Sequence, residues 1–284
     1  MVLYTNEQLK QFTKDLSDTE EAKAKHSIEM VEDAVKNYDW GAVGLKCPKI
    51  CRKGSYNNGT NVKIDSDVDI YALFSGWYLV DTQNQCISER HHGDGHNYEY
   101  HRHYLEVALK NKFGDQMKTG HKAFKIKETS YKHEADVMGA ILAKDDNNIE
   151  NYNGIRTFFN EGSTCITYPI QDKKNSDYKD VLTGGYYKQM VRIFKGIKND
   201  LDLDIPSFLI ECMVYNIDNM YIMDSATDYL GKARNIVKMW DLYLPGQASK
   251  FVELNEIKLL FSHKQKWTVM DAVNFVNKMK EVLF

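Results

Sequence analysis

The chain of 284 residues is long enough to bury a sizeable core in one large domain or in two closely joined domains. Hydrophobic residues make up 43% of it and charged residues 27%, with only 4 prolines, which is typical of a globular protein without long linkers. The 37 lysines and arginines against 40 acidic residues give a net charge of −3, which excludes constitutive binding to long nucleic acid, because such binding usually needs a basic excess.

Two helices open the chain, over residues 6–12 and 19–38. The second carries apolar residues at helical spacing along one stripe. Glu20 and Glu21 fall in its first turn, where negative charge is favourable. We therefore expect this helix to bury one face.

The stretch 54–74, GSYNNGTNVKIDSDVDIYALF, joins a loop to a strand. Its first part is rich in glycine and asparagine and is not expected to form regular structure, whereas its end alternates as a buried strand does. Residues two apart in a strand share a face and lie roughly 6.6 Å apart, so Asp67 and Asp69 present two carboxylates to one side. Val68 and Ile70 then point inward. Like charges disfavour one another unless a cation neutralises them, so the pair predicts bound Mg²⁺ or Mn²⁺.

Spacing excludes two other loop types in this stretch. An EF-hand that started at Asp65 would need glycine and glutamate where the chain has Ile70 and Gly76. A Walker phosphate loop needs a lysine that residues 54–60 lack. A surface hairpin with solvated aspartates stays open, since Asp-x-Asp is frequent by chance. The Gly-Ser pair just upstream favours the metal site.

A histidine-rich segment, residues 88–97, follows the strand. Its sequence ERHHGDGHN holds His91, His92 and His96, and His101 and His103 come shortly after. Metal ligands must be fixed by surrounding structure, and a Gly-Asp-Gly turn is a mobile place. We therefore predict a solvated loop and no zinc site. A helix over 98–113, ended by Gly114, comes next.

Two strands are predicted after this helix, at 123–127 and 134–142. Asp136 stands near the head of the second, which is otherwise apolar, and a charge in such a place needs a partner. If this strand lies beside the strand of Asp67, Asp136 completes three carboxylates of the kind used in two-metal phosphoryl or nucleotidyl transfer. A capping role at the surface stays open for Asp136. A hairpin over 155–159 and 164–168, around Gly162, completes this half.

From residue 177 onward the pattern is helical. Gly184-Gly185 breaks the run 177–200, and Pro206 at a first-turn position starts the next helix. A further helix over 225–244 is expected to end at Pro245.

Two side-chain patterns mark this helical half. Thr268 and Asp271 resemble a capping box in front of a terminal helix that reaches Phe284. Basic residues recur three to four apart on one helix face, which usually is only a solvated face: Lys188, Arg192, Lys195 and Lys198.

Five sequence blocks carry a resemblance to a known family. In order they are GSYNNGT, SDVDIY, HEADV, TGGYYKQMVRIFK and IPSFLIEC, and together they resemble the bacterial cGAS/DncV-like nucleotidyltransferases, within the wider polymerase-beta-like superfamily. The similarity covers nearly the whole chain. It implies an α+β fold: a polymerase-beta-like nucleotidyltransferase core, with a mixed sheet and flanking helices, plus a C-terminal helical domain. We expect the core with its N-terminal helices over 1–170 and the helical domain over 171–284.

The resemblance also implies roles for individual residues. Asp67, Asp69 and Asp136 resemble the family's metal-binding triad, and Asp136 could also act as general base toward a 3′- or 2′-hydroxyl. Asp65 is an alternative member of the pair, but Ser66 and the apolar run after Asp69 fit the family pattern better.

Further positions match the family's nucleotide site. Gly54 and Ser55 match its phosphate loop, where a hydroxyl and backbone N–H groups face the donor triphosphate and glycine permits close approach. Lys188 matches the helix lysine that reaches the triphosphate, and Ser207 the serine that assists it. Phe208 matches an aromatic position that stacks a base, although a core role is equally compatible with its surroundings.

The function that the resemblance implies is synthesis of cyclic di- or oligonucleotide messengers from NTPs with Mg²⁺ (or Mn²⁺), in bacterial anti-phage signalling operons (CBASS). There the messenger activates a separately encoded effector. The zinc cluster of the animal DNA sensor in the superfamily has no counterpart here, which speaks against activation by DNA. Transfer of a nucleotide to an RNA end or a protein hydroxyl, or a catalytically silent NTP-binding protein, stay open as alternatives.

The expected location is the cytoplasm. No segment reaches the roughly 18 to 20 apolar residues of a membrane span, and the N-terminus lacks a cationic start followed by an apolar run. The five cysteines are scattered and odd in number, which favours reduced thiols. We expect a monomer whose partners are NTP substrates.

Overall fold

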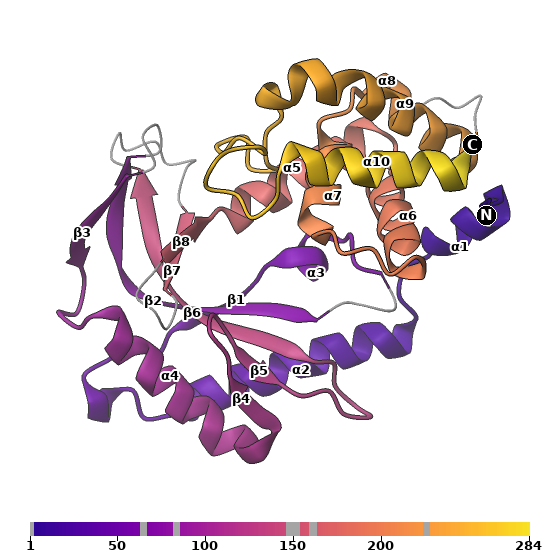
Figure 1. Ribbon diagram of the computed structural model, residues 1–284. Helices are drawn as coiled ribbons and strands as arrows, with labels where there is room; N and C mark the ends of the chain where they lie inside the picture. Colours follow the sequence, from indigo (N-terminus) through magenta and orange to yellow (C-terminus); the bar gives the residue numbers. More distant parts are fainter. Residues whose placement is uncertain (1–2, 63–66, 82–85, 146–153, 159–163, 224–227) are drawn as a thin grey trace. The chain divides into compact units, whose positions relative to one another are not determined.

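The computed structural model of the protein describes residues 3–62, 67–81, 86–145, 154–158, 164–223 and 228–284. Strands and helices are both abundant, and Figure 1 shows their arrangement along the chain. The α+β class predicted from the sequence is confirmed.

The described residues belong to two compact units, and each unit is assembled from separate parts of the chain. The sheet unit contains Ser17–Asn57 and Ser66–Ile170, and the helical unit contains Met1–Leu16, Asn58–Asp65 and Gln171–Phe284. The helical unit thus includes two segments that precede residue 170. The division into domains 1–170 and 171–284 stays a prediction.

The sheet unit is built on a mixed sheet. The strands are β1 Lys49–Arg52, β2 Val68–Asp81, β3 Cys86–His92, β4 Met117–Thr119, β5 Phe124–Ile126, β6 Ala135–Asp145, β7 Gly154–Phe158 and β8 Thr164–Thr167. They are ordered β1-β2-β6-β5-β4, with β3 paired to β2 and β7 joining β6 to β8. The central pair, β2 and β6, is parallel, and the other described pairs are antiparallel.

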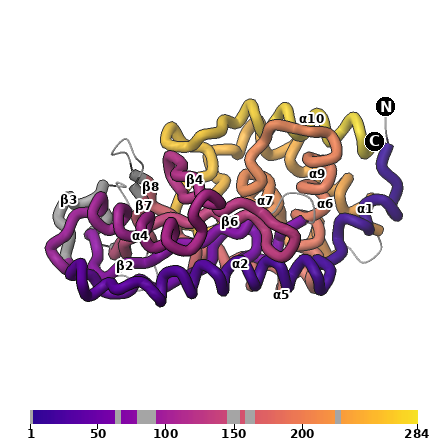
Figure 2. The backbone as a smooth tube through the Cα atoms, turned by 90° about the horizontal axis from the view of Figure 1, so that it is seen from below, coloured from indigo at the N-terminus to yellow at the C-terminus, as the bar shows by residue number. Residues whose placement is uncertain are grey.

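Two helices cover one face of this sheet. Figures 1 and 2 show α2 (Asp18–Lys36) and α4 (Tyr98–Phe113) side by side below it. The residues they bury include Val68 and Ile70 of β2 and Val137 of β6, all fully buried in one apolar cluster with both helices. Burial of alternate strand residues on this face leaves the residues between them on the opposite face.

The helical unit packs around its own core. Its helices are α1 Asn6–Phe12, α5 Pro169–Leu182, which starts in the sheet unit, α6 Tyr186–Asp200, α7 Ser207–Tyr215, α8 Asn219–Met223, α9 Tyr229–Gln247 and α10 Val269–Leu283. Figure 1 shows α9 and α10 running alongside each other, and Trp240 of α9 contacts both Phe194 of α6 and Phe275 of α10. The capping box of Thr268 with Asp271 is confirmed.

The glycine break between α5 and α6 is also confirmed. Gly184 and Gly185 have φ values of +61° and +87°, in the left-handed region that favours glycine. Short 3-10 turns occur at Gly41–Val43, Gly114–Gln116 and Ala248–Lys250.

Three elements differ from the predictions. Residues 54–58, expected to be irregular, form the one-turn helix α3 (Gly54–Asn58). Part of the predicted histidine-rich loop is strand β3, whose polar sequence carries no alternation that would reveal it. Helix α9 continues past Pro245, because a proline in the last turn removes one hydrogen bond close to the helix end. The predicted Gly162 turn and the start of the helix at Ser225 lie outside the described residues.

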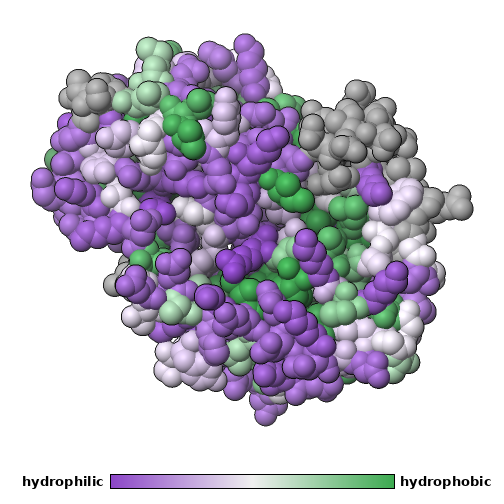
Figure 3. Space-filling view, turned by 180° about the vertical axis from the view of Figure 1, so that it is seen from behind, coloured by the Kyte–Doolittle hydropathy of each residue, from purple (hydrophilic) through white to green (hydrophobic). Residues whose placement is uncertain are grey.

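The face shown in Figure 3 is covered mainly by hydrophilic residues, with hydrophobic ones in smaller groups. Among the described residues, no helix is both long enough and apolar enough to cross a membrane.

Candidate active site

Two of the predicted metal ligands lie next to each other across the central strands. Asp69 of β2 pairs directly with Asp136 of β6 in the parallel register. Paired residues of neighbouring strands share a face, so both carboxylates project from the face opposite to α2 and α4. Their side chains are 35% and 23% exposed, so solvent and ions can reach them. The arrangement on which the predicted triad depends, with the strand of Asp136 beside that of Asp69, is therefore present.

Asp67 lies one residue before β2 begins and is exposed, whereas Asp65 and Ser66 lie outside the described residues. In the part of the chain that the structure describes, no three His, Cys, Asp or Glu side chains converge as a metal site. The structure therefore brings together Asp69 and Asp136 and leaves Asp67 at the entrance to the strand. The metal triad as a whole stays a prediction.

The donor groups present are those that a divalent ion requires. Within the described chain, Oδ1 of Asp136 is buried and has no hydrogen-bond partner, although buried acceptors normally have one. Carboxylate oxygens are the preferred ligands of Mg²⁺ and Mn²⁺. A cation held between Asp69 and Asp136 would satisfy this oxygen, so the residues fit the predicted metal.

Two lysines that sequence reasoning missed flank the carboxylate pair. Nζ of Lys53 lies 4.0 Å from Oδ1 of Asp69, and Nζ of Lys125 lies 3.7 Å from Oδ1 of Asp136. Lys125 pairs with Asp136 across β5 and β6, and Lys53 comes directly after the end of β1, so the two lysines lie on either side of the two carboxylates. Burial lowers the pKa of Lys53, and the Asp69 carboxylate opposes this effect. Two features of the sequence could have pointed to these lysines. They are the alternation around Lys125 and the position of Lys53 beside Gly54.

Gly54 opens α3 directly against the carboxylate of Asp69. Its φ is +68°, and a Cβ at this position would come closer to Oδ2 of Asp69 than real Cβ atoms do. The positive φ and the nearby carboxylate both favour a residue without a side chain. The close packing of this turn against Asp69 therefore explains why glycine stands at position 54. Ser55 follows in the single turn of α3 and is half-buried.

Lys188 lies in the first turn of α6, in the helical unit. Its Nζ donates a hydrogen bond of 2.6 Å to Oδ1 of Asp177 on α5, and its side chain is 18% exposed. Burial alone would raise the pKa of Asp177, but the hydrogen bonds from Lys173 and Lys188 outweigh burial and hold this pKa below its usual range. In this arrangement Lys188 is paired with a carboxylate that a triphosphate would have to replace.

Ser207 and Phe208 form the start of α7, in the same unit as Lys188. Phe208 is half-buried against the helical core, and its ring centroid lies 6.3 Å from that of Trp267. From the sequence, Phe208 could either stack on a base or pack in the core. The contact with Trp267 shows that one side of its ring packs against the helical core.

The turn after β3 is more ordered than the predicted solvated loop. His101 is fully buried, and its Nε2 lies 2.9 Å from Oδ2 of Asp94. Asp94 also accepts hydrogen bonds from Ser75 and from the backbone of His96. Gly93 and Gly95 are exposed as expected of a solvated loop, and the half-buried carboxylate of Asp94 organises the turn between them.

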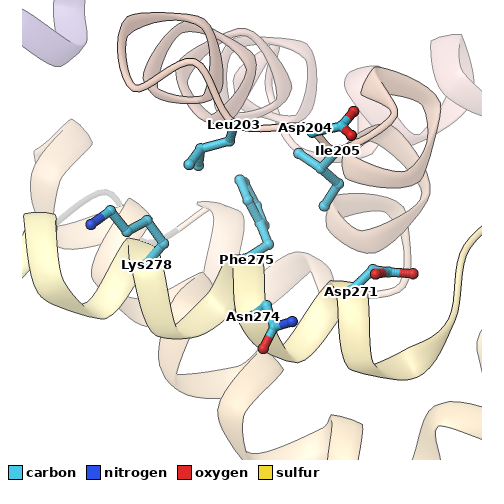
Figure 4. A pocket seen from close by; sticks show the side chains of 7 residues that line it. All are labelled: Leu203, Asp204, Ile205, Asp271, Asn274, Phe275 and Lys278. Carbon is cyan, nitrogen blue, oxygen red and sulfur yellow. The ribbon is translucent and has the colours of Figure 1, made fainter.

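A cavity of about 170 Å³ in the helical unit contains none of the predicted site residues. In Figure 4, Phe275 projects from α10 into the space between Leu203 and Ile205. The polar residues at its rim, Asp204, Asp271 and Asn274, are not buried. Its geometry therefore shows no buried polar group aimed at a ligand, among the residues that line it.

Comparison with known proteins identifies the family. A model of the cGAS/DncV-like nucleotidyltransferase C-terminal helical domain matches residues 174–284. The chain is 31% identical over 283 residues to the cyclic dipyrimidine nucleotide synthase CdnE of Legionella pneumophila, with 94% of each chain covered. It is 28% identical over 291 residues to the cyclic dipurine nucleotide synthase of Elizabethkingia meningoseptica, with 97% of each covered.

The fold agrees with these relationships. The structure of Elizabethkingia meningoseptica CdnE cyclic dinucleotide synthase with GTP and Apcpp matches with a TM-score of 0.80 and 26% identity, over 98% of each chain. The predicted fold, a mixed sheet with flanking helices and a C-terminal helical part, is confirmed by this match. The chain belongs to the bacterial cGAS/DncV-like nucleotidyltransferases.

Proposed function

We propose that the protein joins NTPs into a cyclic di- or oligonucleotide and releases pyrophosphate. The observation that carries the proposal is the Asp69–Asp136 pair on neighbouring parallel strands, with a glycine of the candidate phosphate loop packed against it. The names of the relatives, which are cyclic dipyrimidine and cyclic dipurine synthases, support this reaction class. The GTP and Apcpp of the Elizabethkingia meningoseptica structure support NTPs as substrates.

In this proposal Asp67, Asp69 and Asp136 hold Mg²⁺ or Mn²⁺. Such an ion, when bound, supplies positive charge that neutralises phosphoryl oxygens during transfer. Asp136 also accepts the proton of the attacking 3′- or 2′-hydroxyl, a role that the second oxygen of its carboxylate leaves open. The hydroxyl oxygen then bonds to the α-phosphorus as the bond to the pyrophosphate oxygen breaks.

The remaining residues bind and orient the donor nucleotide. Gly54 permits close approach of the backbone, and Ser55 offers a hydroxyl and an N–H group to the triphosphate. Lys188 exchanges Asp177 for phosphate oxygens, assisted by Ser207. Phe208 stacks a base with one face of its ring.

The biological setting follows from the same proposal. The product is a messenger in anti-phage signalling that activates a separately encoded effector, and the enzyme works as a cytoplasmic monomer. The balance of acidic over basic residues favours small nucleotides over long nucleic acid as ligands.

Incubation of the pure protein with labelled NTPs and Mg²⁺ tests the proposal. A small product that resists phosphatase supports a cyclic nucleotide, and mass analysis after an equimolar NTP mixture identifies its bases and linkage. Labelled macromolecule would instead indicate transfer to an RNA end or a protein hydroxyl. Binding without turnover would indicate a silent NTP-binding protein. Product formation that is unchanged in the double variant Asp67→Ala with Asp69→Ala would overturn the assignment of the site.

A further inference from the structure

The basic row on α6 is not the solvated face that its spacing predicted. Lys195 is 2% exposed and the side chain of Arg192 is 12% exposed. Both side chains donate hydrogen bonds to the short segment Asn58–Thr60 of the same unit. This segment closely follows Gly54 and Ser55 in the sequence, so it is the downstream end of the candidate phosphate loop.

Arg192 holds the middle of the segment. Its Nη2 donates to the carbonyl oxygen of Gly59 at 2.9 Å, and its Nη1 donates to the carbonyl oxygen of Thr13 at 3.1 Å. Asp15 completes an ion pair with the same guanidinium at 2.7 Å. The planar guanidinium thereby joins the loop segment to the chain after α1, a geometry that a lysine does not reproduce.

Lys195 and Glu211 hold both ends of the segment. Nζ of Lys195 donates to the carbonyl oxygen of Thr60 at 3.1 Å and forms an ion pair with Glu211 of α7. Glu211 accepts hydrogen bonds from the Thr60 hydroxyl at 2.8 Å and from the Asn58 amide at 3.2 Å. Glu211, Asn58 and Thr60 are all buried. An ion pair removed from water is stable only with such additional hydrogen bonds, so the network fixes the segment firmly.

Gly59 lies directly beside the end of Lys188. Its φ is +68°, and a Cβ at this position would lie 3.4 Å from Nζ of Lys188. The same helix therefore carries the candidate triphosphate lysine and the two residues, Arg192 and Lys195, that hold the loop next to it. The loop segment and the ammonium group occupy one fixed arrangement.

We propose that Arg192, Lys195 and Glu211 are positioning residues for the triphosphate of the substrate. They fix the segment Asn58–Thr60 against α6 of the same unit, so that the backbone of this segment and Lys188 meet the phosphates in a preset geometry. Ordering a loop costs conformational entropy, and a loop that is already held binds its ligand more tightly. This inference rests on the proposed function, because it concerns how the same site binds NTPs.

The test compares the affinity for a triphosphate with the affinity for the matching monophosphate. Dissociation constants are measured on the full chain with Mg²⁺ for non-hydrolysable ATP and UTP analogues and for AMP and UMP. The double variant Lys195→Met with Glu211→Gln removes the ion pair and the hydrogen bond from Lys195 to Thr60 without leaving a lone buried charge. We expect it to bind the triphosphate analogue about tenfold more weakly, with monophosphate affinity within about twofold of the wild type.

Lys278→Met with Glu281→Gln is the matched control, since it removes an exposed ion pair from α10 of the same unit by the same substitutions. We expect wild-type affinities in this control. Arg192→Lys keeps a positive charge beside Asp15 but loses the two-pronged contact, and it gives the answer alone if the double variant does not fold. We expect its ratio of triphosphate to monophosphate affinity to fall as well.

A ratio equal to that of the wild type in both variants, whatever the melting temperature, would overturn the inference and reduce the network to a structural role. Failure of the proposed function has a different signature, because in that case the wild-type protein itself forms no cyclic product from NTPs.

Discussion

The two units differ in how a buried carboxylate is hydrogen-bonded. In the helical unit, the carboxylate of Glu211 accepts hydrogen bonds from the side chains of Asn58 and Thr60 and forms an ion pair with Lys195. In the sheet unit, Oδ1 of Asp136 is buried without a hydrogen bond in the described chain, and the ammonium group of Lys125 lies 3.7 Å away. A satisfied network holds structure, whereas a buried carboxylate oxygen without a hydrogen bond costs free energy and is kept where a ligand uses it. The comparison therefore predicts which charges act through the structure that they hold and which act directly in the reaction.

The largest expected effect is on catalysis. Asp136→Asn keeps the shape of the side chain but removes its charge and its capacity to accept a proton. We expect product formation from NTPs to fall by at least about a hundredfold. The melting temperature should stay within a few degrees of the wild type or rise, because the substitution relieves repulsion from Asp69. A loss of stability with retained activity would reverse the roles that we assign to the two units.

The converse change tests the satisfied network. Lys195→Met alone leaves Glu211 buried without its ion-pair partner, and breaking such a pair typically costs about 3–5 kcal/mol in the free energy of unfolding. Urea unfolding measures this cost. Adding Glu211→Gln should recover part of the loss, because no lone charge then remains buried. An equal loss in the single and double variants would show that the charges do not interact.

A second buried carboxylate of the helical unit sharpens the comparison by its pH dependence. Burial, aided by the charges of Glu253 and Glu211, raises the pKa of Asp172 to about 7, although the hydrogen bond from Asn255 and the charge of Lys258 oppose this rise. The ordinary value is 3.8, so the folded state binds the proton more tightly than the unfolded state does. The stability contributed by this proton is complete below about pH 4 and is lost as the pH rises through about 7.

The substitution Asp172→Asn removes this dependence. Between about pH 5 and pH 7.5, the free energy of unfolding of the wild type should fall by on the order of 2 kcal/mol relative to that of the variant. The carbonyl oxygen of the new side-chain amide can still accept the hydrogen bond from Asn255, so the packing is kept. Urea unfolding at several pH values measures the difference, and parallel curves for the two proteins would show that Asp172 is ionised throughout.

The sequence predicted the sheet unit better than the contacts of the helical unit. Alternation located β2 and β6, because this signal is local to a strand, whereas their parallel pairing was only a condition for the triad until the structure showed it. The contacts of Arg192 and Lys195 with residues 58–60 join parts of the chain that are distant in sequence, which helical spacing cannot reveal. The spacing of the row predicted its helix correctly but not its buried environment.

Lys53 and α3 show the same limit at shorter range. The glycine and asparagine content of residues 54–58 indicated a turn, but the single helical turn depends on Gly54 packing against Asp69, a residue of the following strand. For Lys53 the sequence offers only the neighbouring Gly54, and the contact with Asp69 in the structure shows that this lysine balances a carboxylate.

The smallest expected effect on stability comes from substitutions of glycine. Two such variants separate the two reasons for glycine at position 54, which are its positive φ and its contact with Asp69. Gly54→Ala meets both the left-handed backbone and the carboxylate of Asp69, whereas Gly184→Ala, with a similar φ of +61°, meets no atom within 4 Å in the described chain. Backbone strain should cost each variant roughly 1 kcal/mol in urea unfolding. Only Gly54→Ala should also displace Asp69, and its product formation should fall by about tenfold or more, since small shifts of catalytic groups have effects of this size. Equal activity in the two variants would mean that Asp69 moves aside without consequence, and that the close packing of the loop against it plays no part in catalysis.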